Sequence, residues 1–184
     1  MKLNKLNKLI CAAGALTSFT AAADNDALSQ LALKRASFTM EQAVEKVSCD
    51  YPGQIAEFAV DDHRGQSAYQ IKVLNLLKEE KYKLYLSTED GSLLKEKSSS
   101  FKTLGFNSLD DDDYQALQEL QVSEFNLQST IAMVSEKYNA EIVEFELENE
   151  KGITFYKFKL LDQHSRQHVY VDVKTGEMNN IIKS

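Results

Sequence analysis

The feature that most constrains the fold of this chain is an internal repeat at a constant offset. Eight residues of the first half recur 87 positions later without a gap. The identical pairs are Phe38 and Phe125 (125 − 38 = 87), Val47 and Val134, Tyr51 and Tyr138, Glu57 and Glu144, Phe58 and Phe145, Gly65 and Gly152, Tyr69 and Tyr156, and Lys72 and Lys159. Beyond a two-residue deletion the offset becomes 85, since Tyr85 matches Tyr170 and Gly91 matches Gly176. Self-similarity at one fixed period indicates that a single supersecondary unit occurs twice.

Each copy predicts one helix followed by antiparallel strands. In the first copy, Thr39 and Gln42 form the capping box of a helix that Pro52 and Gly53 end. Apolar and polar residues then alternate, as in half-buried strands. The inward positions are Ala56, Phe58, Val60, Tyr69, Ile71, Val73, Tyr82, Leu84 and Leu86, then Val143, Phe145, Leu147, Tyr156, Phe158, Leu160, Val169, Val171 and Val173. We therefore predict an α+β fold of two tandem repeats, each a helix packed on one face of a three- to four-stranded antiparallel meander whose other face is open.

The repeats are expected to span residues 38–97 and 125–184. Residues 24–37 hold three leucines among polar residues and predict an N-terminal arm or a short helix. Residues 98–124 predict a connector that contains a helix. Four adjacent carboxylates, Asp110–Asp113, precede that helix. They lack the alternating spacing of a calcium loop, so they indicate capping of the helix N-terminus.

The first 23 residues predict a secretory signal peptide. Three lysines and no acid precede a short apolar run, Leu9–Phe19, and Ala21–Ala23 supply small residues for cleavage before Asp24. The run is shorter than the roughly 20 residues that a membrane span needs. We therefore expect a periplasmic or secreted protein, cleaved after Ala23.

Charge and cysteine content narrow the possible functions. The chain has a net charge of −7, and loss of the signal peptide removes three lysines and no acid, which gives −10. Such an acidic protein lacks the electrostatic footprint of a nucleic-acid or anionic-membrane binder. The cysteine that remains, Cys49, has no internal partner. We expect a half-buried small apolar residue there, with a reactive thiol or an intermolecular bridge as the alternatives.

No residue spacing typical of an enzyme or a cofactor site is present. The sequence lacks H-E-x-x-H, G-x-S-x-G, a glycine-rich phosphate loop and C-x-x-C. Its histidines are His63, His164 and His168. The last two have a helical zinc spacing, but the pattern places them beside a hairpin turn, where that spacing has no special meaning. We predict no catalytic residue, no cofactor and no metal site.

Two outward-facing features are candidates for contact with a partner. Tyr85 and Tyr170 are equivalent and both point outward, which often marks a contact surface. Strand propensity and packing between the two units are the alternative explanation. The outward row of Glu144, Glu146 and Glu148 lies beside an outward lysine row, so the two rows would form cross-strand pairs on neighbouring strands. The glutamates are most simply a solvated face, or else they receive a basic partner segment.

The ending of the second copy resembles a known family. The segment Tyr170–Glu177 reads Y-V-D-x-x-T-G-E after one helix and alternating strands, and it is similar to the ending of the PepSY domain. The first copy resembles a more diverged member, with Ser87 in place of Asp172 and Asp90 in place of Thr175. PepSY domains occur in the propeptides of thermolysin-like metallopeptidases and in exported or membrane-tethered bacterial proteins.

The resemblance implies a role without catalysis. Family members are thought to restrain peptidases outside the cytoplasm or to act as binding modules. This chain would be a non-enzymatic exported module that restrains a peptidase or another envelope protein in trans. The alternative hypothesis is an envelope domain that senses a small ligand or a metal in the groove between the repeats.

Overall fold

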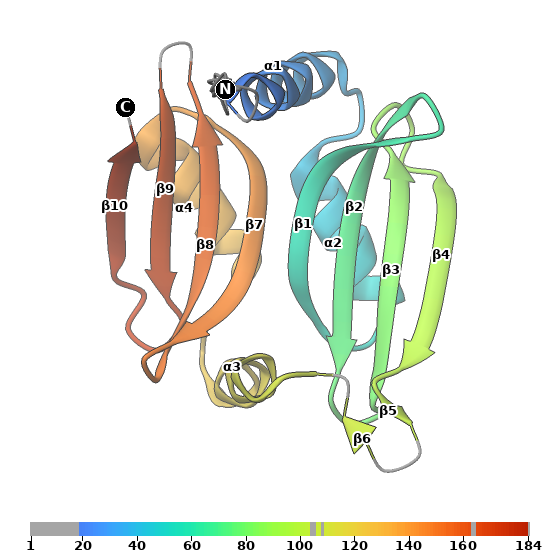
Figure 1. Cartoon of the computed structure of the whole chain (residues 1–184), viewed down its shortest axis with the longest axis vertical. Coiled ribbons are helices and arrows are strands. Elements are labelled where there is room, and N and C mark those ends of the chain that lie inside the picture. The colour runs from blue at the N-terminus through green and yellow to red at the C-terminus, as the bar shows by residue number, and fades with distance from the viewer. Residues whose placement is uncertain (1–18, 104–105, 108, 163–164, 184) are drawn as a thin grey trace, which may run out of the picture.

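The computed structural model describes residues 19–103, 106–107, 109–162 and 165–183. Across these residues, helices accompany an eight-stranded antiparallel sheet (Figure 1). The elements are α1 (Phe19–Arg35), α2 (Met40–Asp50), β1 (Gln54–His63), β2 (Gln66–Asn75), β3 (Glu80–Ser87), β4 (Leu93–Ser100), β5 (Lys102–Thr103), β6 (Phe106–Asn107), α3 (Asp111–Val122), α4 (Leu127–Tyr138), β7 (Glu141–Glu150), β8 (Ile153–Leu161), β9 (Arg166–Asp172) and β10 (Met178–Lys183). The sheet order is β10-β9-β8-β7-β1-β2-β3-β4, with β5 and β6 forming a separate pair.

The predicted duplicated α+β fold is confirmed. One unit is α2 followed by β1 to β4, and the other is α4 followed by β7 to β10. Helices α2 and α4 begin 87 positions apart (127 − 40), as do strands β1 and β7 (141 − 54). The capping box at Thr39 forms with Gln42, and Asn126 caps α4 at the equivalent position. The same local signals therefore start the same elements in both copies.

The two units join edge to edge through β1 and β7. Phe58 of β1 pairs with Phe145 of β7, its own equivalent in the other copy, and their rings stack at 5.2 Å. The neighbouring pairs, Glu57 with Glu146 and Ala59 with Glu144, are related by the same symmetry. This self-complementary pairing is the kind found at a two-fold dimer interface. Here a single chain supplies both sides of the interface.

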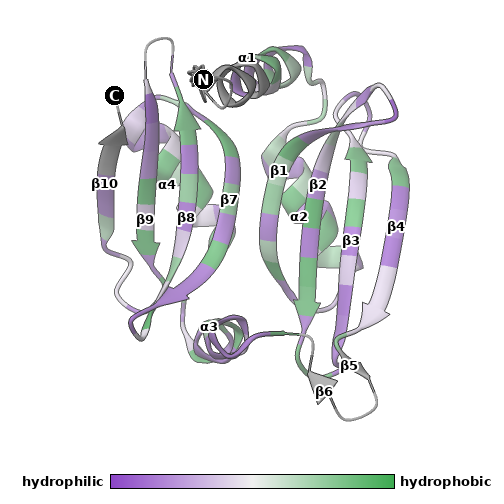
Figure 2. Cartoon of the chain, in the orientation of Figure 1, coloured by the Kyte–Doolittle hydropathy of each residue, from purple (hydrophilic) through white to green (hydrophobic). Residues whose placement is uncertain are grey.

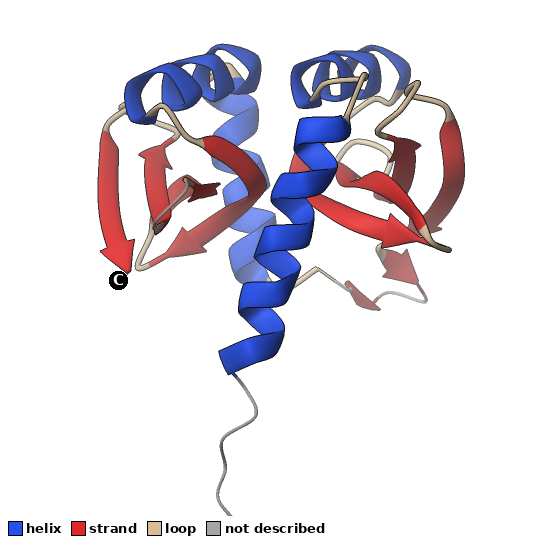
Figure 3. Ribbon diagram, turned by 90° about the horizontal axis from the view of Figure 1, so that it is seen from above, coloured by secondary structure: helices blue, strands red, loops and turns tan. Residues whose placement is uncertain are grey.

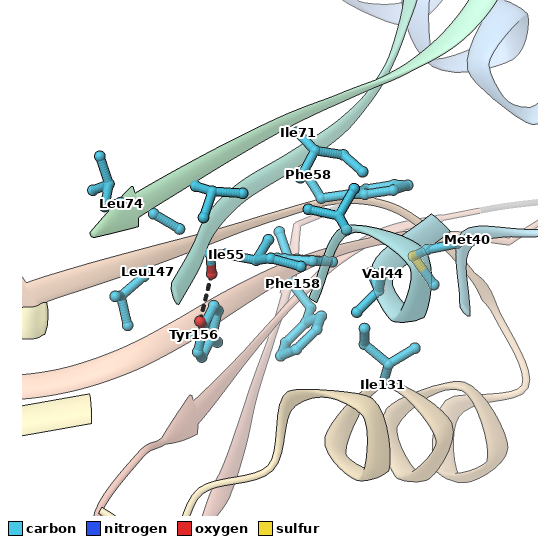
Figure 4. Close-up of a cluster of buried hydrophobic side chains, with 14 of the residues drawn as sticks. Met40, Val44, Ile55, Phe58, Ile71, Leu74, Ile131, Leu147, Tyr156 and Phe158 are labelled. Carbon is cyan, nitrogen blue, oxygen red and sulfur yellow. Dashed lines mark hydrogen bonds between the residues drawn. The ribbon is translucent and has the colours of Figure 1, made fainter. Parts of the chain in front are cut away.

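The inner face of the joined sheet carries a shared core under α2 and α4. Val44 of α2 and Ile131 of α4 are fully buried and lie side by side above the sheet (Figure 4). The buried hydroxyl of Tyr156 donates a 2.6 Å hydrogen bond to the carbonyl of Ile55 on the other copy. A β-bulge follows Ile55, so this bond reaches a carbonyl at a point where the regular ladder shifts. The two units are therefore held together by helix packing and by a hydrogen bond, in addition to the pairing of β1 with β7.

Helices α1 and α3 fill the wedges where β1 and β7 diverge. Only three residue pairs join β1 to β7, and the strands bow apart above and below them (Figure 1). Viewed from above, a helix crosses each wedge between the two halves of the sheet (Figure 3). Arg35 and Val122, the last residues of α1 and α3, are 87 positions apart (122 − 35), so these helices belong to the repeat as well. The repeat unit is therefore larger than the sequence predicted.

Alternation along the strands gives the sheet its two faces. Polar and apolar residues alternate along central strands such as β7 and β8 (Figure 2). The predicted inward residues are buried apart from Val60 and Tyr82, which are half-buried. The prediction of an open outer face was only partly right, because α1 and α3 reach it through the wedges. Cys49 was also predicted wrongly: it is exposed rather than half-buried, near the end of α2.

The segments outside the predicted repeats contain helices, as predicted for the connector and as one of the two alternatives for the N-terminal segment. The arm at 24–37 is mostly the helix α1, and the predicted cleavage position after Ala23 falls inside that helix. The remainder of the predicted signal peptide, residues 1–18, lies outside the described residues. None of the helices described combines the length and apolar character needed to cross a membrane. In the connector, Phe101 is buried, and Asp110 caps α3 by accepting a bond from Asp113 N, as predicted.

Two equivalent glycines offer a test of packing in the first copy. Gly91 and Gly176 have φ values of +70° and +71°, so alanine costs about 1 kcal/mol at either position. At Gly91 the new Cβ would also lie 2.6 Å from Cζ of Phe38, whereas nothing lies within 4 Å at Gly176. Phe38 cannot withdraw easily, because its N–H donates to Thr88 and its carbonyl accepts from Tyr69.

We therefore expect Gly91→Ala to lower the free energy of unfolding by ~1–3 kcal/mol more than Gly176→Ala does. Urea unfolding of both variants measures the difference. Equal losses would mean that Phe38 does not pack against this turn as described.

Candidate functional site

The face of the sheet opposite α2 and α4, here called the outer face, carries ordered rows of charge. Glu144 and Glu146 on β7 lie directly across from Lys159 and Lys157 on β8. The predicted pairing of the glutamate row with the lysine row is thus confirmed. Lys157 forms its ion pair with Glu148, at 2.7 Å, and lies between two carboxylates.

Each wedge helix places an acid on a lysine–glutamate pair of the other copy. Asp26 of α1 lies 2.7 Å from Nζ of Lys159 and also pairs with Arg166, and its side chain is 13% exposed. Glu144 completes this group at 3.6 Å from Lys159. A half-buried carboxylate with two cationic partners holds its helix more firmly than an exposed pair would. Helix α1 is therefore anchored to the second copy.

The other wedge repeats this arrangement with equivalent residues. Lys72 and Glu57, the counterparts of Lys159 and Glu144, form an ion pair on the first copy. Asp113 of α3, the counterpart of Asp26, interacts electrostatically with Lys72. Burial raises the pKa of Asp113, and Lys72 opposes that rise. The sequence contained the signal, because Asp26 and Asp113 are identical at the 87-residue offset, but it was missed.

Glu146 is the least compensated acid at the centre of the outer face. It faces Glu57 across the junction and is half-buried, and no ion pair to it occurs among the described residues. Burial raises its pKa first, and the charges of Glu148 and Glu57 raise it further. The expectation of a plain solvated glutamate row therefore holds for Glu144, whose side chain is 47% exposed, but not for Glu146. The joining of the two copies and the wedge helices are what partly bury it.

A small charged hollow opens beside this glutamate. It measures about 160 Å³, and its walls come from β7, β8 and β9, with Glu146, Lys157 and His168 among the lining residues. His168 lies within β9 rather than beside a turn, and it faces Lys159 on β8. The other member of that histidine pair, His164, lies outside the described residues. Among the residues described, no three or more His, Cys, Asp or Glu side chains gather as metal ligands would.

The two tyrosines predicted as contacts lie far apart on the outer face. Tyr85 on β3 is half-buried, donates to Gln70 at 2.9 Å and has Lys95 Nζ 5.3 Å from its ring centre. Tyr170 on β9 is half-buried and packs edge-on against Phe155. Five strand spacings, about 24 Å, separate β3 from β9 along the sheet. Each tyrosine thus packs within its own unit, and the two lie on either side of the charged residues of β7 and β8.

The sequence motif at the end of β9 is a turn. The Asp172 carboxylate accepts hydrogen bonds from the N–H groups of Lys174 and Thr175, and the Thr175 hydroxyl accepts one from Glu177. Gly176 has a left-handed φ of +71° and donates its N–H to the carbonyl of Asp172. The Asp, Thr and Gly of this motif therefore serve to satisfy the hydrogen-bonding groups of the turn backbone.

The first copy builds the same turn from different side chains. The Ser87 hydroxyl accepts from Glu89 N–H, and the Asp90 carboxylate accepts from Ser92 N–H. The Ser92 backbone bond is the main cause that lowers the pKa of Asp90. Gly91 repeats the bond of Gly176 by donating to the carbonyl of Ser87. The departures of the first copy from the motif thus preserve its geometry.

Fold and outer face together define a duplicated helix-and-meander module with a charged face between two wedge helices. Residues 130–178 match the PepSY family, described as the peptidase propeptide and YPEB domain. The match lies within the second copy and includes the Asp172 turn. The second copy is therefore similar to the PepSY domain over residues 130–178, which confirms the resemblance found in its sequence.

Two solved structures are distantly similar to this chain. No curated protein sequence matches this chain. A candidate lipoprotein from Clostridium difficile 630 has 16% identity and a TM-score of 0.44, covering 77% of this chain and 91% of that one. The YpeB C-terminal domain of Bacillus megaterium has 12% identity and a TM-score of 0.31, covering 83% of this chain and 69% of that one.

The raised pKa of Glu146 predicts a specific pH dependence of stability. The native state holds this proton to higher pH than the unfolded chain, whose value is near 4.5. Its stabilising effect is complete below pH 4.5 and is lost as the pH rises through the raised pKa. Glu146→Gln removes the titration, so we expect the variant to gain stability relative to the wild type between about pH 4 and about pH 7.

Urea midpoints of the wild type and the variant, measured at about pH 4 and at about pH 7, give this gain. Glu150→Gln, at an exposed position at the end of the same strand, is the matched control and should show no such trend. A constant difference between wild type and Glu146→Gln at both pH values would contradict the burial of this carboxylate.

Proposed function

We propose that this protein is a non-enzymatic, exported PepSY-like module that binds and restrains a peptidase or another envelope protein in trans. The description of the family as a peptidase propeptide domain supports a role beside peptidases. Export follows from the signal peptide expected at residues 1–23, with cleavage after Ala23 and a periplasmic or secreted destination. Binding is assigned to the outer face.

The observation that carries this proposal is the incompletely compensated negative charge at the centre of the outer face. Glu146 is half-buried next to Glu57, Glu144 and Glu148, and Lys157, the cation directly across from it, forms its ion pair with Glu148 instead. A basic side chain of a partner supplies a further cation and recovers part of the desolvation cost. The partner segment is therefore expected to be basic.

The flanking tyrosines give this surface its apolar contacts. Tyr85 and Tyr170 lie on either side of the central charges, and both keep part of the ring exposed. Half-exposed aromatic side chains with fixed neighbours lose little entropy when a partner covers them. Each tyrosine is proposed to contact the segments of the partner that flank its basic residue.

The alternative function, sensing of a small ligand between the repeats, also has a specific observation in its favour. A hollow of about 650 Å³ lies between α1 of the first copy and α4 and β8 of the second. This volume is in the range of small-molecule sites.

Inhibition assays test the main proposal. The purified protein is titrated against secreted metallopeptidases of its own organism, and hydrolysis of a peptide substrate is followed. We expect one of these peptidases to be slowed in a saturable way. Glu146→Gln should weaken that inhibition by about tenfold or more, because it removes one charged contact worth about 1.4 kcal/mol or more.

The control variants separate binding from stability. Tyr85→Ala and Tyr170→Ala should each weaken inhibition, whereas Glu150→Gln should leave it unchanged. All variants are first compared by urea unfolding. If no secreted peptidase is slowed and no envelope protein co-purifies with the protein, the proposal fails.

A further inference from the structure

Two equivalent hollows lie beneath the wedge helices, one in each half of the molecule. The larger, of about 650 Å³, lies between α1 and the corner where α4 meets β7 and is called the α1 hollow. The smaller, of about 200 Å³, lies between α3 and the corner where α2 meets β1 and is called the α3 hollow. Corresponding lining residues differ by the repeat offset of 87. The duplication thus provides two versions of one site for comparison.

The two hollows differ by charge at matched positions. The α1 hollow is lined by Lys34, Glu141 and Asp162. Their equivalents in the α3 hollow are Gln121 (121 − 34 = 87), Gln54 (141 − 54 = 87) and Asn75 (162 − 75 = 87). Each charged side chain of the α1 hollow thus corresponds to an uncharged amide side chain in the α3 hollow. The fold accepts either set, so the charges of the α1 hollow are not needed to build it.

One carboxylate oxygen of the half-buried Glu141, Oε2, is itself buried and lacks a hydrogen-bond partner among the described residues. A buried carboxylate oxygen without a donor costs free energy. Asp162 differs, because its carboxylate accepts from the N–H and the hydroxyl of Ser165 and is committed to that turn. Glu141 is therefore the acid of the hollow that is available to a ligand.

Lys34 supplies an opposite charge on the facing wall. It is exposed on α1, and neither an ion pair nor a hydrogen bond is found for its side chain in the described part of the chain. The two charges belong to different copies, Lys34 to the first and Glu141 to the second, and no ion pair joins them across the hollow. A ligand with both an ammonium and a carboxylate can satisfy both of them. The terminal torsion of a glutamate is soft, so a small rotation turns its buried oxygen toward such a ligand.

A second, smaller hollow adjoins the first at Glu141. It measures about 260 Å³, and Glu141 lines both of them. The apolar side chains of Leu33, Met40 and Ile142 are among its lining residues. An apolar group attached next to the ammonium could enter it, away from Lys34. The geometry thus separates three chemical subsites: an acid, a base and an apolar recess.

We propose that the α1 hollow binds a free α-amino acid with an apolar side chain. The ammonium of the ligand pairs with Glu141, its carboxylate with Lys34, and its side chain enters the recess beside Leu33 and Met40. This site goes beyond the partner-binding function, because it lies between the wedge helix and the α4 corner and not on the outer face. Neither proposal requires the other.

Titration with l-leucine tests the site directly. Amide chemical shifts of the purified protein are followed by NMR as l-leucine is added. We expect saturable shifts confined to residues around Lys34, Ser135–Glu141 and Leu161, with a Kd in the millimolar range or below. Isocaproate, which lacks the ammonium, and isoamylamine, which lacks the carboxylate, should each bind at least about tenfold more weakly. Glycine, which lacks the side chain, should also bind more weakly.

Two variants copy the other hollow and so preserve the fold. Glu141→Gln and Lys34→Gln should each weaken l-leucine binding by about tenfold or more without lowering the urea midpoint. Gln54→Glu in the α3 hollow is the matched control and should leave the affinity unchanged.

Absence of shifts with l-leucine would overturn the proposal, and so would equal affinity in Glu141→Gln. Equal binding of isoamylamine and l-leucine would reduce the site to a cation site and contradict the role of Lys34. The assay contains no peptidase and no protein partner, so its failure leaves the partner-binding function untouched.

Discussion

The stacking of Phe58 on Phe145 at the junction of β1 and β7 is the contact on which the rest of the structure depends. Both rings are fully buried, and the pairing joins two four-stranded meanders into one sheet. Because the two residues are equivalent in the repeat, everything around them is arranged with approximate two-fold symmetry. A meander alone would leave an unpaired, apolar strand edge at this position. Duplication in one chain covers that edge permanently.

Because the two repeat units are related by approximate symmetry, the differences between them indicate where function resides. The ion groups around Lys72 and Lys159, the bulges after Ile55 and Ile142, and the turns at Gly91 and Gly176 are built alike. The hollows beneath α1 and α3 are not, because only one of them is charged. These shared features are explained by folding. Features confined to one copy are the better places to look for function.

Sequence patterns predicted the repeated units well because their signals are local. Capping at Thr39, strand alternation and the DG turn depend on neighbouring residues, and all of them formed as expected. The joining of β1 to β7 could not be predicted this way, since it depends on residues about 87 positions apart with no local signature. That junction and the wedge helices also decide how deeply Glu146 and Glu141 are buried. The candidate sites therefore emerged only when the tertiary arrangement was known.

The anchoring of α1 by Asp26 has a consequence for the connectivity of the chain. Asp26 bonds to Arg166 on β9, and Arg166 pairs with Lys183 on β10, so α1 lies close to the strand pair β9–β10. Both halves repeat the same order of two helices and four strands. A circular permutant that links the last strand to α1 and opens the loop before α3 would carry the second copy first. Such a permutant would keep the same strand order and the same pairing of Phe58 with Phe145.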